Sequence, residues 1–494
     1  LIGLPPSPEE VEAFVANQDA KAYEQLVERL LASEHLGERM AIYWLDLVRY
    51  ADTVGYHGDQ EHHASPYRDY VIDAFNLNLP FDQFTREQLA GDLVPDSGPD
   101  QKIASCYNRL LQTSHEGGVQ AKEYLAIYAA DRVRNLSAAW MGATMGCAQC
   151  HDHKFDPYTT RDFYSMAAFF ADLDEDQHLK RGSDTTPTKR EPEAALLARR
   201  ERERLKPVQV KIAELEKQLA AVPPDQPEAV ESLKKQLAAC VEQRDAIQKA
   251  ARTVMISVAK EPRTLRILPR GNWLDDSGDI VEPAVPEFLG KLAVSDRRAT
   301  RLDLANWLTD AEHGAGGLSA RVFVNRLWYL FFGVGIAKSL DDFGGQGSPP
   351  VHPELLDNLA VEFVESGWDV KHIVKLMVLS RAYRQSSLEP PDLRERDPEN
   401  QFFARQSRFR LPAETIRDNA LEISGLLVRD VGRASVHPYQ PAGYYKHLNF
   451  PAREYKHDTD NGQWRRGVYV HWQRQYLHPM LKAFDAPSRE ECTA

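Results

Sequence analysis

The sequence predicts a mainly α-helical protein of several domains. Two helix-rich segments, one before about residue 175 and one from Arg301 onward, place apolar residues at the spacing of a helix. A charged stretch between them has a heptad pattern, and only a short region after it alternates as strands do. We therefore expect a helical domain over 1–180, a coiled-coil hairpin over 190–252, a small β module over 253–295 and a helical domain over 296–494.

The first helical domain begins with a helix-start signal at residues 6–10, Pro-Ser-Pro-Glu-Glu. A later helix has an apolar face that includes Met40 and Trp44, and its opposite face carries Asp46, Arg49 and Tyr50. We expect those three polar residues to be solvated. A long helix is predicted from Val119 to Met145, and small residues toward its end allow another helix or a flat cofactor to approach closely.

Residues 192–252 predict an antiparallel helical hairpin that is inserted between the domains. A Pro-rich break at 223–227 interrupts an apolar seam with alternating spacings of three and four, formed by Leu205, Val208, Ile212, Leu215 and Leu219, then Leu233, Leu237, Cys240 and Ile247. We expect its charged residues to form a solvated surface.

After the hairpin, alternation at Val254, Ile256 and Val258 and again at Leu265 and Ile267 predicts short strands. Helices return over 304–308, 322–332 and 353–365, and the aromatic residues of the second of these helices are expected in the core.

The formal charge of −13 argues against a nucleic-acid partner and against an anionic membrane surface. No apolar run approaches the roughly 18–20 residues that a membrane-spanning helix requires, so we expect no transmembrane segment in this chain.

The most specific motif is Cys147-Ala148-Gln149-Cys150-His151. A C-x-x-C-H run supplies two thiols and an imidazole at the spacing that attaches a c-type haem, with His151 as the iron ligand. Covalent attachment implies an extracytoplasmic compartment, periplasmic or secreted. The sequence thus predicts haem c as the cofactor.

Three other interpretations of the motif stay open. The thiols could form a redox centre, or they could be two free buried thiols. Zinc or another divalent metal is the third, with Cys147, Cys150, His151 and His153 as ligands and His115 or a carboxylate completing the set.

Further site candidates come from residues near the motif. Met166 and His115 are the candidate sixth ligands of a haem iron, and a vacant or water-bound sixth position would suit oxidation. His115, Glu116 and His153 are candidate catalytic residues, the first two because they lie in a Gly-rich loop before the long helix. Arg132 could hold the haem propionates or form an internal ion pair.

Two alternative functions use other residues. A divalent-metal hydrolase could draw its ligands from Asp46, Asp52, Asp69, Glu116, His151, His153 and Asp156. A glycan-binding or scaffold protein would use the C-terminal aromatic residues Tyr439, Tyr444, Tyr445, Trp464, Tyr469 and Trp472.

Several longer motifs cover most of the chain outside the hairpin. In the first half they are Gly3-Leu4-Pro5-Pro6, Trp44 to Asp52, Tyr67 to Ile72, Gln88 to Leu93, Glu116-Gly117-Gly118 and Cys147 to Pro157; in the second they are Val324 to Trp328, Asp341 to Gly344, His352 to Asp357, Ser380 to Ser386 and Phe484 to Arg489. Together these motifs resemble a family pair abundant in planctomycetes, a cytochrome-like domain of unknown function followed by a companion planctomycete-specific domain.

The resemblance implies a secreted or periplasmic protein that is often encoded with carbohydrate-degrading functions. It also implies a longer C-terminal domain, so we expect residues to be missing there, and at the start, where the chain begins at Leu1 without a Met. We therefore predict a c-type haem protein acting in electron transfer or oxidation, linked to polysaccharide breakdown, with a redox partner protein or a carbohydrate-derived substrate.

Overall fold

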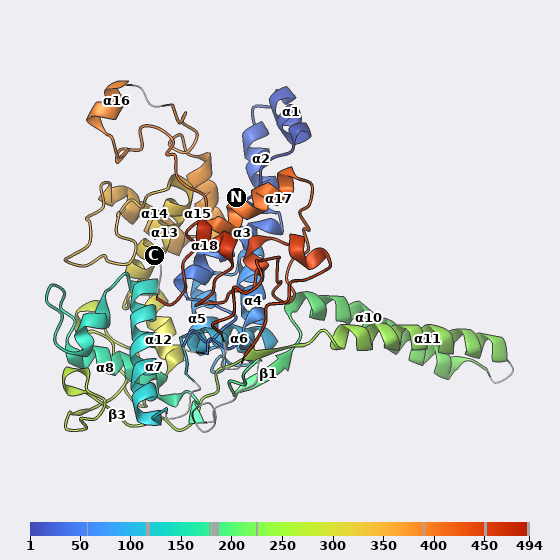
Figure 1. Cartoon of the computed structure of the whole chain (residues 1–494), viewed down its shortest axis with the longest axis horizontal. Helices are drawn as coiled ribbons and strands as arrows, with labels where there is room; N and C mark the ends of the chain where they lie inside the picture. Colours follow the sequence, from blue (N-terminus) through green and yellow to red (C-terminus); the bar gives the residue numbers. More distant parts are fainter. Residues whose placement is uncertain are drawn as a thin grey trace.

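The computed structural model describes residues 1–494 except 57, 115–118, 177–178, 180–186, 224–225, 389–390, 449–451 and 492–494. The protein is mainly helical, as expected, and a long arm projects from its body (Figure 1). Among the described residues the strands form two sheets of two strands each. None of the helices in the described residues has the length and apolar character that a membrane-spanning helix requires.

The first helical segment is a series of eight described helices, and Trp44 lies in its core. Its helices are α1 (Pro8–Ala16), α2 (Ala22–Leu31), α3 (His35–Leu47), α4 (Ser65–Asn76), α5 (Phe81–Ala90), α6 (Pro99–Ala104), α7 (Ala121–Leu136) and α8 (Thr160–Ala168). Ser7 caps α1 and forms a capping box with Glu10, as the helix-start signal predicts. The Trp44 ring is 1% exposed and contacts Phe84 and Trp140 at centroid distances of 5.0 and 5.4 Å.

The prediction that Asp46, Arg49 and Tyr50, at the end of α3 and just after it, are solvated is wrong. Arg49 is buried and donates to Asp131, Tyr50 is buried and donates to Asp52 at 2.8 Å, and Asp46 accepts from Arg489 at 2.7 Å. The C-terminal part of the chain covers this face, so its polar groups form ion pairs and hydrogen bonds inside the protein.

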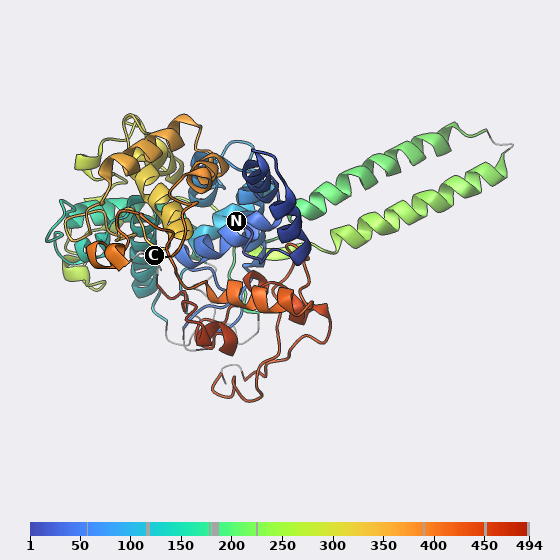
Figure 2. The same cartoon turned by 90° about the horizontal axis from the view of Figure 1, so that it is seen from above.

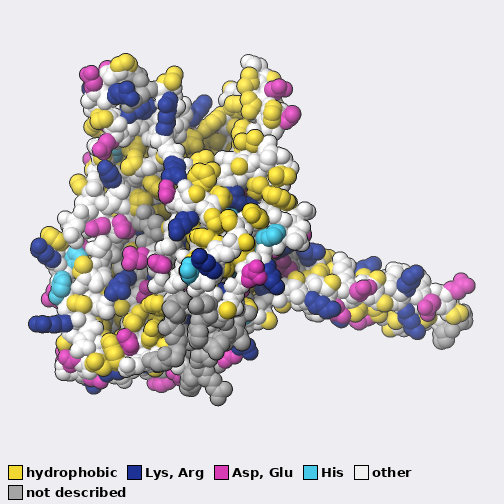
Figure 3. Space-filling view, in the orientation of Figure 1, with side chains coloured by type: hydrophobic (Ala, Val, Ile, Leu, Met, Phe, Trp, Pro, Cys, Tyr) yellow, Lys and Arg dark blue, Asp and Glu magenta, His cyan; other side chains and the backbone are white. Residues whose placement is uncertain are grey.

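The predicted hairpin is the projecting arm. Its helices are α10 (Arg199–Ala221) and α11 (Pro227–Gln248), which lie side by side in Figures 1 and 2. The seam buries Leu205, Val208, Ile212 and Ile247 in a cluster of their own. Acidic and basic side chains are interspersed along the arm in Figure 3, in keeping with a solvated surface.

The arm starts from a small antiparallel sheet. Strand β1 (Glu193–Leu196) pairs with β2 (Arg252–Met255), so that Leu196 lies opposite Arg252. The rest of the predicted β module contains only β3 (Leu265–Arg266) and β4 (Ile280–Val281), paired with each other. Pro262, Pro269 and Pro283 lack the N–H that a longer ladder would need, which keeps these strands short.

The second helical segment contains α12 (Arg301–Thr309), α13 (Gly316–Phe332), α14 (Pro353–Glu365), α15 (Val370–Leu379), α16 (Pro391–Arg396), α17 (Ala413–Ile423) and α18 (Pro479–Ala483). The predicted core role of the α13 aromatic residues is confirmed for Phe323, Trp328, Phe331 and Phe332, while Tyr329 is 37% exposed. Phe323 stacks on Phe81 of α5 at 4.0 Å, and one apolar core runs through both helical segments.

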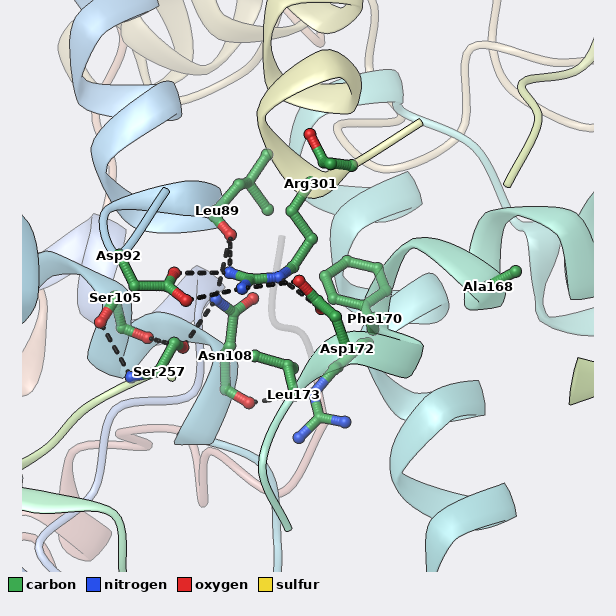
Figure 4. Close-up of polar contacts among 12 residues, drawn as sticks. Leu89, Asp92, Ser105, Asn108, Ala168, Phe170, Asp172, Leu173, Ser257 and Arg301 are labelled. Atoms are coloured by element: carbon green, nitrogen blue, oxygen red, sulfur yellow. Dashed lines mark hydrogen bonds and ion pairs between the residues drawn. The ribbon is translucent and has the colours of Figure 1, made fainter. Parts of the chain in front are cut away.

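A buried arginine fixes the two helical segments to each other. Arg301, at the start of α12, is fully buried and donates to Asp92, to Asp172 and to the Leu89 carbonyl (Figure 4). The side chain of the neighbouring Asn108 donates to Ser257 at 3.1 Å, which links the segment that follows β2 to the same group of contacts. Because these charges are paired away from water, relative movement of the segments would expose or orphan them.

Candidate functional site

The C-x-x-C-H motif follows a sharp reversal at the end of α7. A π-helical turn, Ser137–Met141, ends at Gly142, which adopts a left-handed conformation with φ of 53°. A Cβ at this position would lie 2.8 Å from the Phe343 ring, so the turn needs glycine on both grounds. The reversal leads into the 3-10 helix η3 (Met145–Gln149), which carries the first cysteine.

The two thiols of the motif lie on the surface. Cys147 and Cys150 are both exposed and both free. The Cys150 N–H donates to the Cys147 carbonyl at 3.4 Å, which closes one 3-10 turn between them. The turn brings the two cysteines close together in the structure, and the Cys150 sulfur lies beside Gly271.

His151 is exposed and its ring is oriented by its own backbone. Its Nδ1 lies 2.8 Å from the carbonyl oxygen of Asp152. A carbonyl can only accept, so Nδ1 donates to it, and Nε2 is the ligand atom of the neutral ring. This is the tautomer that a metal-ligating histidine uses, with the outer nitrogen hydrogen-bonded to a carbonyl.

The residues after the motif form a rigid loop that supports it. The His153 ring is buried, and its Nδ1 accepts the Asp156 N–H at 2.9 Å. The His153 N–H donates to the Tyr158 carbonyl at 2.8 Å, and Asp152 accepts the Thr160 N–H at the start of α8. His153 therefore holds the loop together from inside, and the candidate catalytic role has no exposed nitrogen to serve it.

The second helical segment holds the same loop from outside. The Asp156 carboxylate accepts the Gly345 N–H at 2.6 Å, and the Phe343 N–H donates to the Gly142 carbonyl at 2.7 Å. A Cβ on Gly344 would lie 2.4 Å from both Asp156 oxygens. The glycines after Phe343 thus allow this backbone to approach the motif closely.

An apolar cavity of about 610 Å³ adjoins the motif at Gln149, between α7 and α8. Leu125, Ala126, Ala129, Phe163, Ala167, Leu268 and Trp273 provide apolar walls, and Lys122, Arg263 and Arg266 also line it. Tyr164 closes one side: its hydroxyl donates to the Gln149 carbonyl at 3.0 Å, and burial raises its pKa to about 12, with nearby Cys150 adding to the shift. The cavity is large enough for an organic cofactor and has the mixed lining of such sites.

A second cavity of about 660 Å³ lies on the Cys147 side of α7 and is more polar. Charged residues from both segments line it, among them Arg49, Asp131, Arg134, Asp341 and Glu490. Cys147 and Gly146 form part of its wall, so the motif stands between the two cavities.

Arg132 does not reach either cavity. It is buried and forms an ion pair with Glu175 at 2.5 Å while donating to the Asn108 carbonyl at 3.0 Å. Asp131, its neighbour, pairs with Arg49 instead. Helix rotation places consecutive residues on different faces, so Arg132 points to the core and the internal ion pair is the arrangement found.

The two candidate sixth ligands have different outcomes. Met166 is fully buried in the main apolar core and lines neither cavity, so its packing role prevails. His115 and Glu116 lie outside the described residues, so their candidate roles stay predictions.

The carboxylates of the hydrolase hypothesis are dispersed into structural contacts. Asp46 pairs with Arg489, and Asp69 pairs with Arg68 and Arg252. Asp52 accepts from Tyr50, Ser435 and the Trp472 N–H. Burial raises the pKa of Asp52, but His471, Arg68 and these hydrogen bonds bring it below its usual value.

The C-terminal aromatic residues do not form one platform either. Tyr445, Tyr469 and Trp472 are buried, whereas Tyr439 is 65% exposed. Arg489 lies over the Trp472 ring at 3.4 Å and Arg465 over the Tyr469 ring at 4.0 Å, so these rings stabilise buried cations.

Within the described ranges, one group of three metal-ligating side chains is preassembled, and the sequence analysis missed it. Glu61, His437 and His471 each offer a ligand atom, and these atoms lie within 4.8 Å of one another. Cys147, Cys150, His151 and His153 form no such group. More than 370 residues separate Glu61 from the histidines, and no spacing pattern in the sequence links them.

Comparison with protein families agrees with the motifs. Residues 1–175 match the family PSCyt2, a protein of unknown function (DUF1549), and residues 300–494 match PSD1, a protein of unknown function (DUF1553). No curated protein and no solved structure matches the chain. The chain therefore consists of a cytochrome-like, planctomycete-type PSCyt2 domain followed, after the projecting arm, by a PSD1 domain.

Proposed function

We propose that this protein is an extracytoplasmic c-type haem protein that works in electron transfer or oxidation. The observation that carries the proposal is the arrangement of Cys147, Cys150 and His151. Two exposed thiols, joined by one 3-10 turn, are followed by an exposed imidazole whose Nδ1 is bonded to the Asp152 carbonyl, so that Nε2 is the nitrogen available to a ligand. These are the donors that c-type attachment and axial ligation require, and the cytochrome-like family supports the same assignment.

The residues present fit the group in a defined way. The thiols of Cys147 and Cys150 would form the two thioethers, and His151 would be the axial ligand, oriented by the Asp152 carbonyl. When bound, haem would supply one-electron redox chemistry. The loop braced by His153 and Asp156 would keep the donors in place during the reaction.

The apolar cavity beside Gln149 is the surface that suits the macrocycle. Its walls are the apolar faces of α7 and α8, while Lys122, Arg263 and Arg266 provide cations for carboxylates. Arg132, the sequence candidate for the propionates, pairs with Glu175 and lines neither cavity. Lys122 pairs with Asp276 and Arg263 with Glu175, so Arg266, which donates to the Gly278 carbonyl, is the proposed propionate partner.

The sixth coordination position is proposed to be open or held by water. Met166 is packed in the core, and Met145 is buried at the start of the 3-10 helix that carries Cys147, too close to the motif to reach the far side of a haem. An open position suits oxidation better than simple electron transfer. Cyanide and carbon monoxide should then bind readily to the iron. If the protein is low-spin and binds neither ligand, and only a His115→Ala variant binds them, the function would be electron transfer and not oxidation.

The cofactor is tested with the full chain made together with c-type maturation machinery. We expect a pyridine haemochrome α-band and an intact mass increased by one haem. An unshifted mass without the α-band, together with stoichiometric zinc that is lost in a Cys147→Ser, Cys150→Ser variant, would overturn the haem assignment in favour of a metal site at the motif.

The proposed compartment follows from the cofactor, and the proposed substrate class from the resemblance to planctomycete-type proteins encoded with carbohydrate-degrading functions. Thioether formation places the protein in the periplasm or outside the cell, where a redox partner protein or a carbohydrate-derived substrate would meet it. Cell fractionation of the tagged native protein tests this location, and recovery of covalent haem only from the cytoplasm would contradict it.

A further inference from the structure

The seam between the PSCyt2 and PSD1 domains contains a second group of chemically reactive side chains, far from the haem motif in sequence. Glu61 comes from the first domain, and His437 and His471 come from the second. Their ligand atoms lie within 4.8 Å of one another, and the two imidazole rings are stacked at 4.6 Å with an interplanar angle of 25°.

Backbone hydrogen bonds fix the two histidines. The His471 N–H donates to the Val436 carbonyl at 2.8 Å, which sets the neighbouring segments side by side. The His437 N–H donates to Asp458, and the His437 carbonyl accepts the Asp458 N–H, both at 2.8 Å. The two rings are therefore held by paired main-chain contacts on either side.

The segment that carries Glu61 is joined to the same region. The Glu61 carbonyl accepts the Thr188 N–H at 2.8 Å, and Glu61 forms an isolated antiparallel β-bridge with Thr53. Across the domain seam, the Asp52 N–H donates to the Trp472 carbonyl at 3.1 Å, and the Trp472 N–H donates to the Asp52 carboxylate at 2.9 Å. The carboxylate and the imidazoles thus meet because two domains are locked together at this point.

The His471 ring points to a missing ligand. This residue is 8% exposed, and its Nδ1 is a buried nitrogen with no hydrogen-bond partner among the described residues. A buried unpaired polar atom costs free energy, and buried polar groups in native proteins generally have a partner. Glu61 and His437 are only partly buried, so an ion could reach the group from solvent.

We propose that Glu61, His437 and His471 form a site for a divalent transition-metal cation of the Zn²⁺ or Fe²⁺ type. Two imidazoles and one carboxylate are the donors of open catalytic zinc sites and of non-haem iron sites, whereas Mg²⁺ and Ca²⁺ prefer oxygen donors alone. Three protein ligands leave at least one position for water or substrate. The buried Asp52 carboxylate, whose charge acts on both rings, would help to balance the charge of the cation.

The site is tested in the full chain with Cys147→Ser and Cys150→Ser, so that the haem motif cannot bind the probe. After chelator treatment, calorimetry with Zn²⁺ should give one equivalent per chain, and Mg²⁺ should not compete. Glu61→Gln, His437→Ala and His471→Ala should each weaken zinc binding at least about 100-fold, because loss of a direct ligand costs more than loss of a supporting contact. His313→Ala is the matched control, since that side chain is 79% exposed and lies between α12 and α13, outside the proposed site.

Two results would overturn the site: no zinc binding in the chain with Cys147→Ser and Cys150→Ser, or unchanged binding in both Glu61→Gln and His437→Ala. Thermal melting with and without chelator shows whether each variant folds. If a histidine variant does not fold, Glu61→Gln still tests the site, because it keeps the shape of the side chain. Co²⁺ should give d–d bands without a thiolate charge-transfer band. Haem attachment in a Glu61→Gln chain with intact cysteines should be normal, so failure of this site and failure of the haem assignment are distinguishable.

Discussion

Arg466 of the PSD1 domain places its Nη1 2.7 Å from Oε2 of Glu38 in the PSCyt2 domain, and both side chains are fully buried. The same guanidinium donates through Nε to Asp418 at 2.7 Å, and the Tyr469 hydroxyl donates to the other Glu38 oxygen at 2.6 Å. A single cation thus neutralises one carboxylate from each domain. The pair thus joins the two domains through fully buried charges.

Arg466→Met should therefore destabilise the whole protein, because it leaves Glu38 and Asp418 buried without their cation. Breaking such a pair from one side costs about 3–5 kcal/mol. Denaturant unfolding followed by circular dichroism measures the change. Arg321→Ala is the control, since its ion pair with Asp357 is half exposed and should matter by less than about 1 kcal/mol. Equal effects of the two variants would contradict the structural role of Arg466.

The cysteines and His151 should have separable roles in haem binding. Cys147→Ala with Cys150→Ala should abolish covalent haem, whereas His151→Ala should keep attached haem with altered iron coordination, because thioether bonds and axial ligation are independent contributions. Haem staining after denaturing electrophoresis and visible spectra report the two properties. A double cysteine variant that retains its Soret band through denaturation would disprove covalent attachment.

Filling the apolar cavity should disturb the haem environment. Ala129 and Ala167 face this cavity from α7 and α8, so Ala167→Phe should occupy the space proposed for the macrocycle and lower haem loading several-fold. Ala138→Phe, which enters the polar cavity instead, is the matched control. If only Ala138→Phe reduced the loading measured by pyridine haemochrome, the macrocycle would belong in the polar cavity.

The projecting arm should be dispensable for the cofactor. Its helices bury their seam against each other, and Leu196 and Arg252 are paired at its base, so a short Gly/Ser linker can replace residues 205–247 without moving the strands. Arg200 and Arg202 remain, which preserves their ion pairs with Asp73 and Asp100. The visible spectrum should be unchanged; loss of haem in this variant would mean that the arm covers the site.

Stability should depend on pH through Glu414. Burial raises its pKa to about 7, with nearby Asp46 adding to the shift and Arg489 opposing it. The folded protein therefore holds a proton that the unfolded chain has released above about pH 4.5, and stability falls as the pH rises toward and through 7.

Glu414→Gln mimics the protonated side chain and should remove this dependence. Between pH 5 and pH 8, the wild type should lose up to about 3 kcal/mol more stability than the variant. Urea unfolding at both pH values measures the difference. Parallel losses in the two proteins would show that another group controls the dependence.

Local pattern was enough for the main helices and the arm, and it also singles out the C-x-x-C-H motif. The seam residues Leu205, Val208 and Ile212 repeat at the coiled-coil spacing, and the motif is five consecutive residues, so each signal is contained in a short window of sequence. Proline-interrupted segments after the arm were predicted less well, since two-residue strands such as β3 depend on tertiary contacts more than on alternation.

Tertiary structure alone decided which charged groups meet. Periodicity tells which face of a helix is apolar, but it does not tell what covers the other face. Asp46, Arg49 and Tyr50 look solvated in sequence, yet Arg49 and Tyr50 are buried and Asp46 is paired with Arg489 of the C-terminal segment. Arg132 finds Glu175 and Glu61 meets His437 and His471 for the same reason. Such pairs form between residues tens to hundreds of positions apart, and their partners are chosen by the docking of two domains around one core, a contact that no local pattern in the chain encodes.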